Sequence, residues 1–243
     1  MNKITVWDLP IRVFHWVFSI SLSMALIIAF FVDDDSSLFP YHMLFGLTAG
    51  FLLVIRVVIG LFGARYSRFR GLMFPPGETI AYMMKSLMGG ARRYVGHNPG
   101  TAAVALIMFG LAIGLVWTGL TMTSDASEEL HGVLAYMMVA AIVAHLLGML
   151  LHTLHHRENV MMSMVSGKKD GEMIAALPSS QRLAGVLTLL VCSLWIAALF
   201  RGYDAANAVV TIPGIGAVSL GEGESKQEHE GSHEDGNEVE DDD

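Results

Sequence analysis

Histidines inside apolar segments are the residues of this chain best suited to chemistry. Residues 127–159, SEELHGVLAYMMVAAIVAHLLGMLLHTLHHREN, are apolar enough to enter a bilayer, yet they include five histidines. An ionisable side chain in a membrane helix is costly, so it usually faces the interior of a bundle and has a function. Because imidazole nitrogens bind transition metals and haem iron, the pattern points first to metal or haem ligation.

His131 and His145 have the spacing of two side chains on one face of a helix. They are 14 residues apart, so they differ by about 40° around an α-helix and lie about 21 Å apart along it. Two further histidines stand in other apolar segments, His15 in FHW and His42 in YHMLFG. The four side chains form two pairs if their helices bring them to matching depths.

The composition predicts an all-α membrane protein. Of the 243 residues 53% are apolar, and the mean hydropathy is +0.51. Apolar runs of about 20 residues can each cross about 30 Å of hydrocarbon. Five such spans are predicted, at 11–32, 41–62, 101–122, 130–152 and 183–200. No segment shows the alternating pattern of a membrane β-barrel.

Loop charges predict the orientation of these spans. Lys and Arg gather in 63–100 and 153–182, and Lys3 and Arg12 precede the first span, whereas the connections DDDSSLFP and TSDASEE contain neither. Since Lys and Arg mark cytoplasmic loops, we expect a cytoplasmic N-terminus and a periplasmic C-terminus in a bacterial inner membrane.

This orientation matches the four histidines in depth. His15 and His145 then lie near the cytoplasmic surface, and His42 and His131 near the outer surface. Haem iron accepts two axial imidazole nitrogens, which a helix bundle supplies from facing helices. The sequence therefore predicts two stacked b-type haems, with these four residues as iron ligands.

One neighbouring histidine leaves the inner pair open. His152 follows His145 by seven residues and shares its face, so it could replace His145 as the inner ligand. We prefer His145 because His152 lies near the end of the apolar run. His155 and His156 are expected to face water or head groups, and His97, in VGHNPG, to pack within a loop.

Two arginines are candidates to bind the anionic haem propionates. Arg12 lies about one turn before His15, near the inner haem. Arg56 lies about halfway along the second span, where an unpaired guanidinium is costly. We expect it to meet a propionate or a backbone carbonyl, or to extend toward the inner face.

Glycines lie beside the candidate ligands. Gly46 and Gly50 follow His42 at helical spacing, Gly132 follows His131, and Gly148 follows His145. A flat porphyrin needs such clearance, but close helix packing in membranes also favours small residues.

Composition also excludes some classes of site, and it shows that the C-terminal residues are far more acidic than the rest of the chain. The single cysteine, Cys192, rules out an internal disulfide, a four-cysteine metal or iron–sulfur site and a covalent c-type haem. Residues 201–243 hold twelve of the 23 acidic residues in a chain of net charge −8. We predict a di-haem four-helix bundle at 1–170, an extra transmembrane helix at 171–202 and a largely disordered outer acidic tail at 203–243.

Several segments together resemble the bacterial cytochrome b561 family. They are VWDLPIRVFHW, HMLFGLTAGFLLVIRVVIGLFGARYSRF, RRYVGHNPGT and ELHGVLAYMMVAAIVAHLLGMLLHTLHHRENVMMSMVSGKK, within residues 4–170. The branch that includes cytochrome b subunits of nickel–iron hydrogenases is the most similar. The resemblance implies a four-helix bundle with two b haems on the same four histidines, passing electrons between quinone and a partner redox protein.

These observations favour transmembrane electron transfer between the quinone pool and a periplasmic partner, such as a c-type cytochrome. The acidic tail could steer a basic partner. Membrane lipid is an expected partner, and nucleic acid is not. Three alternatives remain open: a membrane anchor for a hydrogenase or other oxidoreductase, a proton- or superoxide-linked oxidoreductase, and a histidine-based metal transporter.

Overall fold

Five long apolar helices make up most of the structure, a computed structural model that describes residues 2–90, 92–207, 209–212, 214 and 216–219. They are α1 (Leu9–Phe31), α2 (Pro40–Phe62), α4 (Pro99–Leu120), α5 (Asp125–His156) and α7 (Arg182–Gly202). Each is long and apolar enough to cross a membrane. The predicted all-α, five-span membrane architecture is therefore confirmed.

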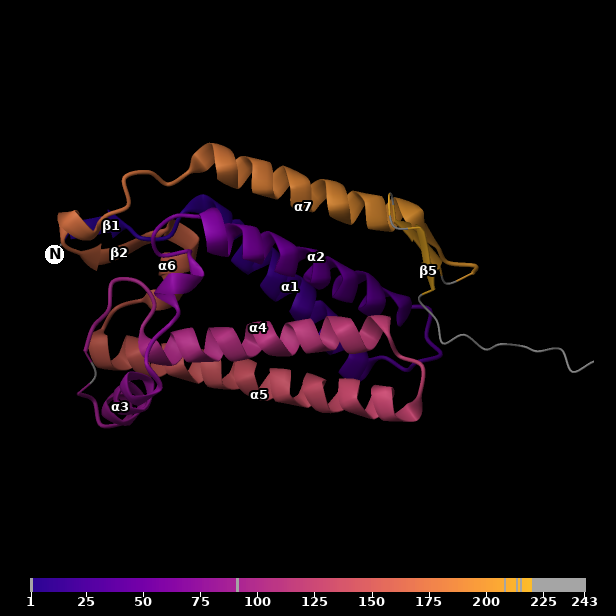
Figure 1. Ribbon diagram of the computed structural model, residues 1–243, viewed down its shortest axis with the longest axis horizontal. Coiled ribbons are helices and arrows are strands. Elements are labelled where there is room, and N and C mark those ends of the chain that lie inside the picture. Colours follow the sequence, from indigo (N-terminus) through magenta and orange to yellow (C-terminus); the bar gives the residue numbers. More distant parts are fainter. Residues whose placement is uncertain (1, 91, 208, 213, 215, 220–243) are drawn as a thin grey trace, which may run out of the picture.

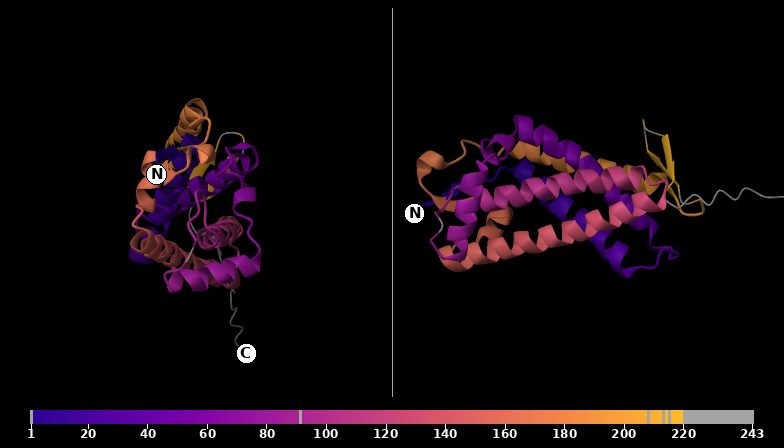
Figure 2. Two further views of the ribbon diagram at one scale, coloured as in Figure 1. Left: turned by 90° about the vertical axis from the view of Figure 1, so that its left-hand side faces the viewer. Right: turned by 60° about the horizontal axis from the view of Figure 1, so that its bottom comes forward.

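Four of these helices, α1, α2, α4 and α5, run side by side, and α7 packs on α1 and α2 away from α5 (Figure 1). The N-terminal end of the bundle also carries α3 (Pro76–Leu87), α6 (Val160–Ser166) and the short 3-10 turns at Phe69–Gly71 and Met173–Ala175. The opposite end, called the far end below, carries the α1–α2 and α4–α5 connections (Figure 2). Both connections lacking Lys and Arg thus lie at one end.

A buried carboxylate anchors the start of α1. Asp8 caps the helix by accepting a hydrogen bond from the Ile11 amide at 3.1 Å. The same side chain accepts from the Ala64 amide at 3.2 Å and the Ser67 hydroxyl at 3.0 Å. Because a buried charge needs such partners, Asp8 ties the first turn of α1, and with it His15, to the loop that follows α2.

Local capping also sets the starts of α4 and α5. The Asn98 side chain accepts from the Thr101 amide at 2.8 Å, with Pro99 in the first turn of α4. Ser124 and Ser127 form a reciprocal capping box at the start of α5. This box lies upstream of the apolar run, so α5 begins earlier than the predicted span at 130–152.

The sequence did not predict the short strands. β1 (Asn2–Thr5) pairs antiparallel with β2 (Lys168–Gly171), which joins the N-terminus to the segment after α6. At the far end, β3 (Tyr203–Asp204), β4 (Val209–Ile212) and β5 (Gly216–Ser219) form an antiparallel sheet. β4 is rich in β-branched residues, which favour strands. The sheet falls in the predicted acidic tail, of which residues 208, 213, 215 and 220–243 lie outside the described ones.

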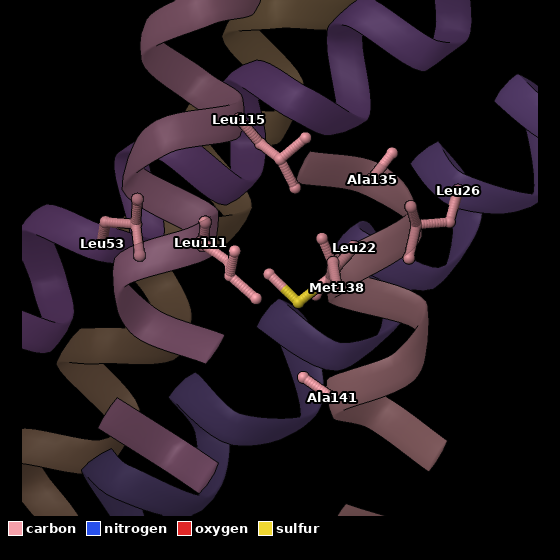
Figure 3. Close-up of a cluster of buried hydrophobic side chains, with 9 residues drawn as sticks. Leu22, Leu26, Leu53, Leu111, Leu115, Ala135, Met138 and Ala141 are labelled. Atoms are coloured by element: carbon pink, nitrogen blue, oxygen red, sulfur yellow. The ribbon is translucent and has the colours of Figure 1, made fainter. Parts of the chain in front are cut away.

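An apolar layer fills the middle of the four-helix bundle (Figure 3). Its buried members are Leu22, Leu26, Leu53, Leu111, Ala112, Leu115, Ala135, Met138 and Ala141. Met138 is fully buried and lies seven residues from both His131 and His145. The layer therefore separates the two levels at which the candidate ligands lie.

Candidate functional site

His42 and His131 meet at the far end of the bundle. His42 lies in the first turn of α2, and His131 in the second turn of α5. Their ring centroids are 6.1 Å apart, and the ring planes are inclined by 78°. The fold thus brings together two histidines that are 89 positions apart in the sequence.

Hydrogen bonds to the Nδ1 atoms orient both rings. The Nδ1 of His42 lies 2.9 Å from the carbonyl oxygen of Ala25 and therefore donates to it. The Nδ1 of His131 lies 2.8 Å from the Thr118 hydroxyl oxygen. That hydroxyl donates its own proton to the Gly114 carbonyl at 2.8 Å, so it accepts from His131. With each Nδ1 engaged, the neutral form of each ring offers its Nε2 to a metal.

The separation of the two rings suits one metal atom between them. Two metal–imidazole bonds of about 2.0–2.1 Å, with a ring radius added on each side, place ring centroids roughly 6 Å apart. The observed 6.1 Å agrees with that arrangement. The described part of the chain contains no group of three or more His, Cys, Asp or Glu side chains able to hold a metal, so a two-histidine site is the one to consider.

His15 on α1 and His145 on α5 form the second pair, toward the N-terminal end. They are close enough for their charges to interact. The Nδ1 atom of each is buried and has no hydrogen-bond partner among the described residues. These Nδ1 atoms thus lack an acceptor of the kind that orients His42 and His131, and it is the proximity of the two rings that pairs them.

Three glycines beside the candidate ligands border open space. A Cβ added at Gly46, Gly132 or Gly148 would meet no described atom within 4 Å. At Gly50, by contrast, it would lie 3.0 Å from Val116, so this residue serves close packing of α2 on α4. No described side chain crowds the first three, so a flat cofactor beside them would meet no clash there, and the imidazole donor set fits haem.

The candidate propionate ligands are both held by backbone carbonyls. The Arg12 Nε atom donates to the Met164 carbonyl at 3.2 Å, and its Nη2 to the Val165 carbonyl. Arg56 is buried, and its Nη1 donates to the Ser67 carbonyl at 3.1 Å. The Arg56 guanidinium also lies 4.6 Å from the Phe69 ring centroid. A backbone carbonyl was one of the expected partners of Arg56. The binding of haem propionates by Arg12 and Arg56 stays a prediction.

His97 packs against Trp7, with ring centroids 4.7 Å apart. Its Nδ1 is buried and has no hydrogen-bond partner within the described ranges. Burial, followed by the positive charges of Arg56 and Lys169, lowers the pKa of His97 to about 3. The ring is therefore neutral at physiological pH, and it packs in a loop next to the His15–His145 level.

His152, the alternative inner ligand, belongs to a buried ionic cluster. Its Nε2 lies 3.8 Å from Oε2 of Glu158. Arg93 holds the same carboxylate with both ends of its guanidinium, at 3.1 Å from Nε and 3.0 Å from Nη2. This contact joins residues 65 positions apart. No pattern in the sequence predicted the ion pair. The cluster links the α3–α4 loop to the end of α5.

The Glu158 carboxylate should make stability depend on pH. Burial by itself raises the pKa of Glu158, but the nearby His152 ring, the hydrogen bond from Arg93 and the charges of Lys169 and Arg93 lower it to about 2. A lowered folded-state pKa stabilises above the unfolded value of 4.5 and loses that effect as pH falls toward 2. We expect Glu158→Gln to lower the free energy of unfolding at pH 7 by on the order of 2 kcal/mol, a value reduced by solvent screening.

Thermal unfolding in detergent between pH 7 and pH 3 measures this effect. The difference between wild type and Glu158→Gln should shrink as the pH falls below 4.5. Glu129→Gln, which replaces an exposed carboxylate on α5, serves as the control and should match wild type throughout. A difference that is independent of pH would contradict the assignment to the charge of Glu158.

Comparison with known proteins identifies one family. The family model for prokaryotic cytochrome b561 matches residues 6–167. This range runs from the end of β1 to the end of α6 and contains all four candidate histidines. It leaves out α7 and the far-end sheet. No curated protein matches the chain, and no solved structure does.

Proposed function

Because this chain belongs to the prokaryotic cytochrome b561 family, a family of di-haem membrane cytochromes in electron transfer, we propose that it connects the quinone pool to a periplasmic redox partner. In this proposal His42 and His131 hold the outer haem b, and His15 and His145 hold the inner one. Arg12 serves a propionate of the inner haem, and Arg56 serves a haem propionate.

The geometry of the His42–His131 pair carries this proposal. Two rings from different helices lie 6.1 Å apart, and each has its Nδ1 engaged by a fixed acceptor. These two residues would hold the iron through Nε2, because the acceptors at Nδ1 select that tautomer. The proximity of His15 and His145 supports the second pair.

The residues of this chain place and tune the two redox centres. Bound haem supplies a one-electron ferric–ferrous couple. The imidazoles hold it, and the acceptors at Nδ1 of His42 and His131 raise the basicity of those ligands. The apolar layer around Met138 excludes water between two levels that lie about 21 Å apart along α5. That low-dielectric surround shifts the potentials of both centres.

Loop charge supports the proposed orientation, with the N-terminus in the cytoplasm and the C-terminus in the periplasm. The connections without Lys and Arg lie together at the far end (Figure 1), which is then the periplasmic side. The far-end sheet and the acidic residues after it would face the redox partner. We also propose three parts for the chain: a di-haem bundle at 1–170, an added transmembrane helix at 171–202 and an outer segment at 203–243.

A spectrum of the purified protein tests the function. We expect sharp visible bands of low-spin haem on reduction, and two haems per chain by pigment analysis. A short-chain quinol should reduce the bound haem, and a soluble c-type cytochrome should reoxidise it. A colourless protein made in cells with ample haem would refute the proposal. A haem protein that quinol leaves oxidised would refute the quinone assignment.

A further inference from the structure

A cavity with basic and aromatic walls opens at the N-terminal end of the bundle. It has a volume of about 610 Å³. We call it the basic cavity, and its lining includes Arg65, Tyr66, Arg68, Arg70, Phe74 and Tyr94. Within the described residues its lining contains no Asp or Glu. Three arginines thus line one hollow, and no acidic residue of its described lining balances their charge.

These arginines have few partners of their own. Arg65 lies with its guanidinium 5.5 Å from the Tyr66 ring centroid. Arg68 donates from Nε to the Gly63 carbonyl at 2.7 Å. In the part of the chain that the structure describes, the ion pairs involve Lys3, Arg93 and His152, and none of the three cavity arginines. Their exposed side chains therefore remain available to an anion.

The aromatic wall of the basic cavity is fixed in place. The Tyr66 hydroxyl donates to the Ala175 carbonyl at 2.8 Å. The Tyr94 hydroxyl donates to the exposed carboxylate of Glu78 at 2.9 Å, and the Tyr94 ring packs on Phe74 with centroids 5.9 Å apart. A wall whose rings are already held in position costs little further ordering when a ligand binds.

The cavity lies at the level where the hydrocarbon-facing surface ends. Its lining residues begin just after the last turn of α2. In that turn the side chains of Leu61 and Phe62 are 58% and 77% exposed. Met73, beside the lining residue Phe74, is 71% exposed. α3, at the same end (Figure 2), exposes Ile80 and other apolar side chains. Exposed apolar side chains next to aromatic rings and arginines are typical of a membrane–water interface.

We propose that the basic cavity binds the phosphate head group of an anionic phospholipid, with the acyl chains lying along the end of α2. Guanidinium groups bind phosphate oxygens through charge-assisted, often bidentate hydrogen bonds. Basic pockets beside membrane helices are suited to anionic lipid head groups. A neutral quinone offers no charge to three arginines, and a soluble phosphate ion makes no use of the apolar rim. This site is independent of the proposed electron transfer.

Native mass spectrometry of the detergent-purified, haem-loaded protein tests the site. The probes are dioctanoyl phosphatidylglycerol, dioctanoyl phosphatidylcholine and inorganic phosphate. We expect phosphatidylglycerol to bind at least about tenfold more tightly than phosphatidylcholine. The triple variant Arg65→Gln, Arg68→Gln, Arg70→Gln should weaken its binding by about tenfold or more. Arg70→Gln alone, which breaks no described hydrogen bond, should weaken it by about threefold.

A second triple variant controls for net charge. Lys85→Gln, Arg92→Gln, Lys168→Gln removes three exposed cations from the same end of the bundle but outside the cavity. It should change the affinity for phosphatidylglycerol by less than about twofold. Equal weakening by both triple variants would overturn the site, as would binding of inorganic phosphate as tight as that of the lipid. Loss of haem in the cavity variant would reassign the arginines to a propionate and overturn the lipid proposal.

Discussion

Replacing His42 with alanine is expected to lower the haem content of the purified protein from two haems per chain to about one, because the outer iron loses an axial bond. His42 lies opposite His131 with no third ligand beside the pair in the described residues. The remaining spectrum should be that of the inner haem alone. Pyridine haemochrome quantification against protein mass, together with the reduced-minus-oxidised spectrum, measures the change.

His155→Ala is the matched control for this experiment. His155 is an exposed histidine on α5 whose Nδ1 bonds the Leu151 carbonyl of its own helix. Its replacement should leave both haems in place. Thr118→Val is a milder companion, since it removes only the acceptor that orients His131. Loss of the acceptor that orients a metal-binding histidine weakens metal binding by about 10–100-fold. An unchanged haem content in His42→Ala would refute the outer pair.

Replacing His145 with alanine is expected to remove the inner haem and leave the outer one, whereas replacing His152 should keep both. His145 lies next to His15, and both have buried, unsatisfied Nδ1 atoms. His152 instead faces Glu158 and packs on the His156 ring, with centroids 4.4 Å apart. The two variants therefore separate a ligand from a member of the ionic cluster on the same helical face.

Haem content and thermal stability should respond differently in these two variants. His145→Ala should lose about half of the haem. His152→Ala should retain the haem and lower the melting temperature, because Glu158 loses a partner in a buried setting. If His152→Ala loses one haem and His145→Ala loses none, the inner ligand is His152 and the pairing by depth is wrong by two turns of α5.

Much of the fold follows from local features of the sequence. The five spans are apolar runs of membrane-crossing length, and a helix is the one way such a run satisfies its backbone inside hydrocarbon. The start of α5 was harder to place, because the capping box at Ser124 lies in a polar segment. The β1–β2 pair was not predictable, since its strands lie at opposite ends of the matched region and are too short to show a period.

The sequence by itself determined that four histidines lie at two depths, because helix rise and loop charge are local properties. Only the tertiary structure decided which atoms surround them: Ala25 and Thr118 as acceptors for the outer pair, the carbonyl of Ser67 for Arg56, and Glu158 with Arg93 around His152. These contacts join residues from separate helices and loops. They depend on how the helices pack against one another, and no spacing along the chain encodes that packing.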